Sequence, residues 1–182
     1  MKTSHKALSI SANGLFANEL SANDLTVKDL AENNQSKDVK ASNLSYHRVN
    51  WKQSSNEILA IRHSVFIIER HYEENVLCDL DDKDCIHLIA KNEDGRTIAC
   101  ARLNPNGRIS KIAVLVSYRG EGIGSRILRE LVAIGKQNKI KLVSLNAEIA
   151  NKHLYDQQNF SAVGPVYMKQ GIPHQMLACK LA

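Results

Sequence analysis

Three glycines at alternating positions form the stretch of this sequence best suited to chemistry. Gly120, Gly122 and Gly124 follow Arg119 and lead into an amphipathic segment, in the order Arg-Gly-Glu-Gly-Ile-Gly-Ser. Without Cβ atoms, a ligand can approach the backbone closely, and the N–H groups at the start of a helix attract anions. Arg119 adds a fixed positive charge. The pattern predicts a turn that holds a phosphate or diphosphate, although a tight strand-to-helix connection would use the same glycines.

Neither of two common phosphate-binding loops explains this glycine spacing. A P-loop continues from its last glycine with Lys and then Ser or Thr, whereas Gly124 is followed by Ser125 and Arg126. A Rossmann turn has the spacing G-x-G-x-x-G, whereas these glycines follow G-x-G-x-G. The sequence instead reads R-x-x-G-x-G, directly after an apolar, strand-like run at 112–116. We therefore expect a phosphate-binding turn of another kind.

Alternating strand-like and helix-like segments surround this turn and would hold it in place. The run Ser54-Ser55-Asn56-Glu57 predicts a capping box that opens a helix of about three turns. A second helix is predicted from 123 to about 136–139 and a third over 150–158. Strands are predicted at 46–51, 86–90, 98–103, 109–116, 142–145 and 176–181. This order predicts an α+β domain with α/β/α layers, in which 109–116 is a central strand.

Composition and charge place the chain among ordinary folded domains. Its 182 residues are 43% hydrophobic and 24% charged, which excludes collagen-like, wholly disordered and coiled-coil chains. No apolar run approaches the roughly 18 residues of a membrane-spanning helix, so no membrane partner is expected. The net charge of +5 favours anionic ligands. Nucleic acid is not expected, because the basic residues are scattered and only 5% of residues are aromatic.

The cysteines indicate neither a disulfide scaffold nor a metal site. Cys78, Cys85, Cys100 and Cys179 are too sparse for a disulfide-stapled chain, and their spacing with the nearby histidines matches no zinc site. We expect no bound metal. Residues 1–30 also have neither the basic start and apolar block nor the cleavage site of a secretory signal. The predicted location is therefore the reducing cytoplasm.

A change of composition near residue 45 divides the chain into a predicted tail, 1–44, and a predicted domain, 45–182. The tail is rich in Asn, Ser, Ala, Lys and Asp, and leucines recur in it every five residues from Leu15 to Leu30. A five-residue step rotates by about 140° on an α-helix, so these leucines do not share a helical face. They could line one coil of a pentapeptide β-solenoid or belong to a weakly ordered appendage. One coil is too little to bury a core, which favours the appendage.

The run R-x-x-G-x-G, after a strand that reads Lys-Ile-Ala-Val, resembles a motif of the GNAT superfamily, the acetyl-CoA-dependent N-acetyltransferases. The resemblance covers most of 61–181. Residues 154–160 are similar to the family's segment F-Y-E-K-x-G-F, with Asn159 for the usual glycine; Asn also tolerates the left-handed conformation. Residues 65–70, 79–87, 101–103 and 171–176 resemble one bacterial subgroup of the family. Arg70 and Glu148 stand where that subgroup has glutamine.

This resemblance implies a GNAT-like fold, with a mixed, mostly antiparallel central sheet flanked by helices, and acetyl-CoA as co-substrate. The strand at 112–116 would separate from the strand at 142–147, and the pantetheine arm would bind between them. The residues that the resemblance assigns to acetyl-CoA are Ile112, Ala113, Val114, Arg119, Gly120, Glu121, Gly122, Ile123, Gly124 and Ser125.

The resemblance also implies roles for side chains around the reacting groups. Tyr155 would protonate the departing thiolate, although an interior tyrosine that only packs on a helix face would occupy the same place. Glu69 is the other candidate catalytic residue. The acetyl group would pass directly to the primary amine of a small molecule or peptide, and a homodimer is among the expected assemblies. The candidates for acceptor binding are Asp82, His87, Arg102 and His174, and Arg102 is expected to hold an acidic partner such as Glu69 or Asp82.

Two alternatives stay open on the sequence alone. Residues 65–66, the acidic loop and Ala101-Arg102-Leu103 also resemble the related acyl-homoserine-lactone synthases. Those enzymes generally lack the turn at 119–124, which argues against this alternative. The domain could also bind acyl-CoA without catalysis, with the tail recruiting partners.

Overall fold

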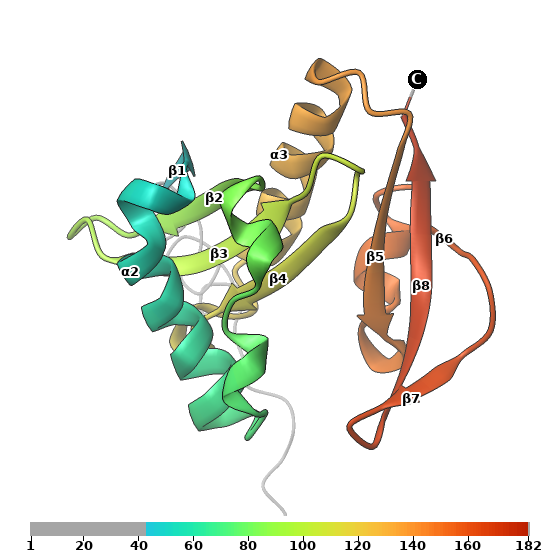
Figure 1. Cartoon of the computed structure of the whole chain (residues 1–182), viewed down its shortest axis with the longest axis horizontal. Coiled ribbons are helices and arrows are strands. Elements are labelled where there is room, and N and C mark those ends of the chain that lie inside the picture. Colours follow the sequence, from blue (N-terminus) through green and yellow to red (C-terminus); the bar gives the residue numbers. More distant parts are fainter. Residues whose placement is uncertain (1–42, 182) are drawn as a thin grey trace, which may run out of the picture. The chain divides into compact units, whose positions relative to one another are not determined.

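Two sheets make up the fold of residues 43–181, the part of the chain that the computed structural model describes; the leucine repeat of the predicted tail lies outside the described residues. The first sheet is antiparallel in the order β1-β2-β3-β4, and the second has the order β5-β8-β6 with β7 beside β8 (Figure 1). The strands of the first sheet are β1 Ser45–Val49, β2 Ile86–Lys91, β3 Thr97–Leu103 and β4 Ile109–Val114. Those of the second are β5 Leu142–Glu148, β6 Ser161–Ala162, β7 Tyr167–Lys169 and β8 Ile172–Lys180.

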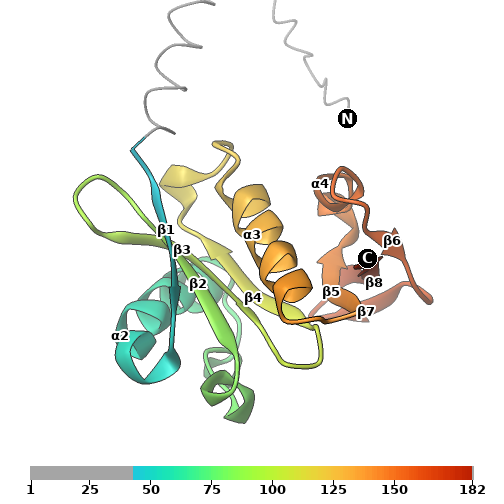
Figure 2. The same cartoon turned by 90° about the horizontal axis from the view of Figure 1, so that it is seen from above.

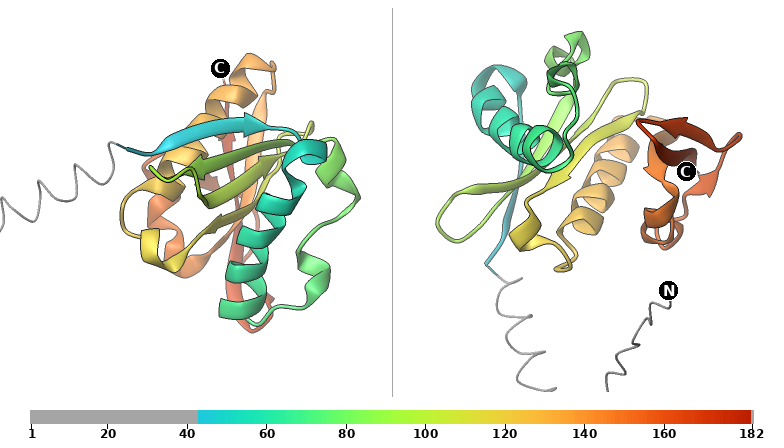
Figure 3. Two further views of the ribbon diagram at one scale, coloured as in Figure 1. Left: turned by 90° about the vertical axis from the view of Figure 1, so that its left-hand side faces the viewer. Right: turned by 90° about the horizontal axis from the view of Figure 1, so that it is seen from below.

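Helix α2, Trp51–Arg62, lies on one face of the first sheet, opposite helix α3 (Figure 3). It begins before the capping box predicted at Ser54, because the Asn50 side chain accepts a hydrogen bond from Gln53 N at 3.0 Å and caps the helix there. Ser54 is buried inside the helix. The predicted helix is therefore confirmed, but its start and its cap were wrong.

Helix α2 continues without a break as a π-helical segment, η1, His63–Glu69. Segments of this kind are rare and are frequent at functional sites. The backbone N–H of Arg70 donates to Val65 O at 3.2 Å, so the segment ends in a closed turn. Glu69 and Arg70 are thus placed at the end of a helix rather than in a loop, which the sequence did not predict.

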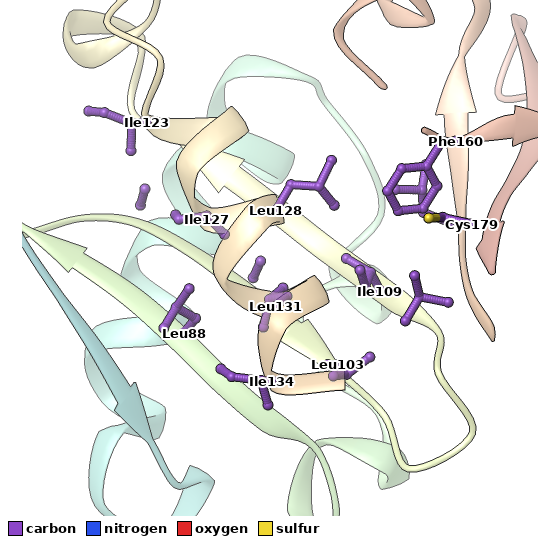
Figure 4. Packing of buried hydrophobic residues seen from close by; sticks show 14 of the residues in the cluster. Leu88, Leu103, Ile109, Ile123, Ile127, Leu128, Leu131, Ile134, Phe160 and Cys179 are labelled. Atoms are coloured by element: carbon purple, nitrogen blue, oxygen red, sulfur yellow. The ribbon is translucent and has the colours of Figure 1, made fainter. Parts of the chain in front are cut away.

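Helix α3, Ile123–Gln137, packs between the two sheets and carries the centre of the hydrophobic core (Figure 2). Figure 4 shows its inner side chains over Leu88 and Leu103 of the first sheet, with Phe160 and Cys179 toward the second. The core residues of α3 are Ile123, Ile127, Leu128, Leu131 and Ile134. At Gly135 an added Cβ atom would lie 3.1 Å from Leu181 and 3.3 Å from Val143, so a glycine allows the helix to approach β5. This predicted helix is confirmed.

Within residues 43–181, one isolated bridge joins the two sheets, between the residue before β4 and a residue of β5. Arg108 pairs with Ser144 in parallel, and Ser144 N donates to Gly107 O at 2.9 Å. A Cβ atom at Gly107 would collide with the carbonyl oxygen of Leu142, so this approach requires glycine. Beyond the bridge no pairing joins β4 and β5 within residues 43–181, and the strands diverge (Figure 1). The run predicted as a central strand is therefore the strand at which the sheet opens.

The remaining elements are short. The predicted helix at 150–158 is a 3₁₀ turn, η5 Ile149–Asn151, followed by α4 His153–Asp156. Strands β6 and β7 were not predicted, because they are two and three residues long and all exposed. Further 3₁₀ turns are η2 Glu74–Val76, η3 Leu80–Lys83 and η4 Val116–Tyr118. The predicted α+β class, with antiparallel strands flanked by helices, is confirmed.

An arginine–aspartate cluster, formed by Arg62, Asp79, Asp82 and Arg102, attaches the acidic loop to the first sheet. Asp82 accepts two hydrogen bonds from Arg62, at 2.9 and 3.0 Å, and both side chains are 0% exposed. Arg102 lies 2.8 Å from Asp82 and makes two hydrogen bonds to Asp79, at 2.5 and 2.6 Å. The acidic partner Asp82 expected for Arg102 is confirmed, whereas Glu69 lies elsewhere. Asp82 thus belongs to the framework of the fold, and no part of its side chain is open to a substrate.

Replacing Asp82 with Asn should destabilise the protein strongly. The substitution leaves Arg62 buried without its counter-charge, which costs about 3–5 kcal/mol of unfolding free energy. Urea denaturation measures this loss. Asp81→Asn, a change at the exposed neighbouring residue, is the matched control and should alter the unfolding free energy by less than about 0.5 kcal/mol.

The pH dependence of this loss tests its electrostatic origin. Burial by itself would raise the pKa of Asp82, but the hydrogen bonds and charge of Arg62, with the hydrogen bond of Arg102, bring it below its ordinary value. The carboxylate therefore stabilises the folded state fully above the ordinary pKa of about 3.9, and this contribution is lost as the pH falls through the lower folded-state value. The difference between wild type and Asp82→Asn should shrink below about pH 4. A difference that persists unchanged in stronger acid would contradict the ion-pair explanation.

Candidate active site

The glycine turn leads from β4 into α3 with its backbone donors available. Gly120 and Gly122 have φ angles of 81° and 75°, in the left-handed region that favours glycine. Within residues 43–181, no hydrogen-bond acceptor is found for the backbone N–H groups of Gly120, Gly122 and the first helical residues 123–125. The positive end of the α3 dipole lies at the same place. The turn therefore has the donors and the field that an anionic group requires.

Arg119 connects this turn to the end of the π-helical segment. Its two terminal nitrogens donate to the two carboxylate oxygens of Glu69, each at 2.6 Å, and its Nε donates to Val114 O at 3.0 Å. The hydrogen bonds from Arg119 hold the pKa of Glu69 below its ordinary value. Glu69 was predicted as a catalytic residue and Arg119 as a cofactor ligand. The structure pairs them, and a carboxylate with a lowered pKa is a weak base, so we assign Glu69 the positioning of Arg119.

The end of β4 directs backbone groups away from β3. Leu115 N donates to Ile98 O at 3.0 Å, so Leu115 faces β3, and so does Ala113 two residues earlier. Val114 lies between them, and its N–H and C=O point to the opposite side because these groups alternate in direction along a strand. The hydrogen bond from Arg119 to Val114 O agrees with this direction. Of the predicted strand contacts to acetyl-CoA, Val114 therefore has its backbone groups on the diverging side.

A β-bulge bends β4 just beyond the bridge to β5. Cys100 pairs with Ala113 and Arg102 with Ser110, so β4 has one residue more than β3 between these pairs. Lys111, within the bulge, has a φ angle of 55°. Bulges bend the strand that carries them and increase its twist. This bulge therefore turns β4 away from β5 and contributes to the divergence.

A cavity of about 530 Å³ lies where β4 and β5 diverge, which is a size common for small-molecule sites. Its walls come from the end of η1, the loop before β2, strands β4, β5 and β8, and the segment around α4. Its residues of most interest are Arg70, Arg102, Lys111, Ile112, Glu148, Asn151, Tyr155 and His174. The structure thus brings together four of the sequence-predicted residues, Ile112, Arg102, Tyr155 and His174. Glu69 and Asp82 are not among the residues that line the cavity.

Tyr155 lines the cavity as a neutral phenol. Burial raises its pKa above the ordinary value, and the negative charge of Glu148 raises it further. Its ring packs edge-on against Phe160, with ring centres 6.3 Å apart. Its hydroxyl has no hydrogen-bond partner among residues 43–181, so it keeps a proton that it can donate.

A second ion pair, not predicted from the sequence, lies in the cavity wall. Arg70 donates to Glu148 at 2.8 Å, and Asn151 donates to the other carboxylate oxygen at 3.3 Å. His174 is the cross-strand neighbour of Glu148, and its Nδ1 lies 2.8 Å from Ile172 O. One indication of this ion pair is present in the sequence: Arg70 and Glu148 have opposite charges, and both stand where the resembled subgroup has glutamine. The two positions are 78 residues apart, so only the fold reveals that they meet.

The family comparison agrees with this geometry. Residues 39–181 match the family described as "Acetyltransferase (GNAT) domain". This chain belongs to the GNAT acetyltransferase family. The match confirms the resemblance and identifies the protein as an acyltransferase, which favours the first of the three functions considered above.

Individual relatives and solved structures are similar to this chain over most of its length. A UPF0039 protein of Schizosaccharomyces pombe is 28% identical over 131 residues, which cover 69% of this chain and 87% of that protein. The structure of an acyl-CoA N-acyltransferase from Pseudomonas aeruginosa is 24% identical with a TM-score of 0.68, over 75% of this chain and 99% of that one. A GNAT family acetyltransferase from Elizabethkingia anophelis, solved with acetyl-CoA bound, is 17% identical with a TM-score of 0.58, over 76% and 99%. The two structural likenesses show the GNAT fold.

Residues 43–181 contain no candidate metal site, no disulfide and no helix suited to span a membrane. No three His, Cys, Asp or Glu side chains in this range are grouped so that they could hold a metal ion. The four cysteines are free thiols. None of the helices in the same range has the length and apolar character needed to span a bilayer.

Glu69→Gln tests whether this carboxylate is a base or a partner of Arg119. We expect the Kd of coenzyme A, measured by calorimetry, and kcat to change by no more than about fivefold, because an exposed ion pair contributes up to about 1 kcal/mol. Loss of a general base would lower kcat by about 10²–10⁴-fold. Arg119→Gln is the matched variant and should raise the Kd more, because it removes a charged donor from the turn. If the Glu69→Gln protein binds coenzyme A normally but has lost turnover, Glu69 is a catalytic residue and the positioning role is wrong.

Proposed function

We propose that this acyltransferase transfers the acetyl group of acetyl-CoA directly to a primary amine, with Tyr155 as the general acid. The observation that carries the proposal is the set of unpartnered backbone N–H groups at the glycine turn within residues 43–181. Cβ atoms added at Gly120 and Gly122 would meet open space, so a diphosphate can reach these donors. The solved GNAT structure with acetyl-CoA bound supports the same co-substrate here.

Acetyl-CoA would supply an activated acetyl thioester, and residues of this chain would orient it and handle the protons. The Val114 N–H, on the diverging side of β4, would donate to the thioester oxygen as negative charge develops there. The amine nitrogen forms a bond to the carbonyl carbon and releases a proton to water. The carbon–sulfur bond breaks, the sulfur takes the Tyr155 proton, and Tyr155 regains a proton from solvent.

The state of Tyr155 suits this role. A general acid must be protonated before the leaving group departs, and the raised pKa keeps the phenol neutral throughout the physiological range. The side chain lines the cavity at which β4 and β5 diverge, where the thioester would lie. Ile112 would contribute to the same groove as a wall of the cavity. Ala113 was predicted to contact acetyl-CoA through its backbone, but its backbone groups face β3 and it is not among the residues that line the cavity.

Acetyl-CoA should raise the melting temperature of the protein. A ligand that binds only the folded state, at about 100 times its Kd, stabilises it by about 2.7 kcal/mol. For a domain of this size that corresponds to roughly 5–10 °C. Differential scanning fluorimetry with and without acetyl-CoA measures the shift, with adenosine as a control that lacks the diphosphate. No shift at saturating acetyl-CoA would refute the proposed co-substrate.

Tyr155→Phe should lower kcat by about 10²-fold or more, because general acids contribute about 10²–10⁴-fold. The ring that packs on Phe160 is retained, so coenzyme A binding should change by less than about twofold. Thiol release with a panel of amines measures kcat, and calorimetry measures binding. Tyr46→Phe, in β1 beneath Arg126, is the matched control and should leave both values unchanged. A Tyr155→Phe enzyme that keeps half of the wild-type rate would remove the general-acid role.

A further inference from the structure

We propose that the acceptor amine also carries an anionic group, a carboxylate or a phosphate, and that Arg108 and Lys169 bind it. The inference rests on the proposed acetyl transfer, because it concerns the second substrate of the same site. Two observations carry the inference. Basic side chains outnumber acidic ones in the cavity wall, and two of the basic side chains have no acidic partner there.

Positive side chains outnumber negative ones around the cavity. The basic residues of its wall are Arg70, Arg102, Arg108, Lys111 and Lys169, and the acidic ones are Asp79, Asp81 and Glu148. Two of the three acids are already paired. Glu148 accepts from Arg70 at 2.8 Å, and Asp79 accepts from Arg102 at 2.5 and 2.6 Å. Asp79 also lies 3.8 Å from Lys111, so only the exposed Asp81 is left to offset Arg108 and Lys169.

Arg108 and Lys169 make no ion pair within residues 43–181, although both line the cavity. Arg108 lies at the bridge between β4 and β5, and Lys169 lies in β7 beside β8. They come from different strands and line one cavity. A guanidinium and an ammonium without protein partners are the donors that carboxylates and phosphates bind best.

Lys111 adds to the positive character of the same wall. Its ammonium donates to Val76 O and lies 3.8 Å from Asp79. Burial lowers the pKa of Lys111, and the nearby charge of Arg102 lowers it further, so the surroundings disfavour another cation. An anionic group in the cavity would relieve this repulsion, whereas a polyamine would increase it.

The part of the cavity near Tyr155 differs in character and suits the amine. Glu148 and Asn151 present a carboxylate and an amide beside Tyr155. Although Arg70 neutralises Glu148, the carboxylate and amide oxygens can still accept hydrogen bonds from the amine, while the anionic group of the same molecule reaches Arg108 and Lys169. A cavity of about 530 Å³ holds a small molecule that carries both groups. The acceptor is therefore a small amine with an acidic substituent.

Matched pairs of amines that differ only in the anionic group test this inference. Suitable pairs are phosphoethanolamine with ethanolamine, and phenylalanine and β-alanine each with its amide. The anionic member should have a kcat/KM at least about tenfold higher in one pair or more, because one charge-assisted contact is worth about a factor of ten. The phosphate pair and the carboxylate pairs distinguish the two sources of negative charge.

Substitutions at the two cations should remove this preference. In Arg108→Gln and Lys169→Gln the ratio of kcat/KM between the members of a pair should fall by about tenfold. Arg108→Glu should reverse the preference, so that the neutral amide has a higher kcat/KM than the anionic amine. A folding defect would lower both values and could not reverse their order. Lys136→Gln, in the last turn of α3, is the control that removes a basic residue elsewhere and should leave the ratio unchanged.

Calorimetry with coenzyme A on the same samples separates the two ways in which the experiment can fail. If coenzyme A does not bind, the proposed acetyl transfer is wrong and this inference is wrong with it. If coenzyme A binds but the anionic members are no better than their neutral partners as substrates, the inference alone is overturned. The same conclusion holds if no member of any pair is bound or acetylated.

Discussion

The isolated bridge that joins the start of β4 to β5 is the constraint on which the rest of the fold of residues 43–181 depends. The strands touch at Arg108 and Ser144, where only a glycine at position 107 leaves room for the carbonyl of Leu142. Beyond that point the bulge at Lys111 bends β4 away. Two parallel strands that are joined at one end and bent apart at the other must leave unpaired backbone between them. The cavity, the free side of Val114 and the position of Tyr155 all follow from this divergence.

Charged contacts hold the walls of this opening. Arg102 reaches from β3 to Asp79 and also donates to Ser110 Oγ of β4 at 2.9 Å. Lys111 reaches from the bulge to the carbonyl of Val76. The arginine–aspartate cluster therefore determines both the position of the acidic loop and that of the bulged strand. A change in this cluster affects the site through geometry, even where the changed residue touches no substrate.

The sequence predicted the elements that have a strong local signal, and it missed those that depend on distant contacts. Helix α3 and the hairpin of β2 and β3 have clear apolar periodicity, and both were predicted within a few residues. The glycine turn was recognised because its chemistry is contained in seven consecutive residues. The pairing of Arg70 with Glu148, and of Glu69 with Arg119, could not be predicted, because side chains far apart in the sequence meet only after folding. For the same reason Asp82, an exposed-looking acid in a loop, proved to be buried.

The arrangement of the two binding regions favours a reaction in which both substrates are bound together. The glycine turn begins α3, which lies on one face of the first sheet, whereas the cavity receives Arg70 and Asp79 from segments that follow α2 on the opposite face (Figure 3). Val114 ends the strand that leads to the glycine turn, and Tyr155 lines the cavity. The thiols of Cys85 and Cys100 are unsuited to holding the acyl group covalently, because both are buried, neither lines the cavity, and burial raises the pKa of each to about 11. The proposed direct attack of an amine on the thioester needs no such thiol, and it requires only that the two proposed substrates meet where β4 and β5 part.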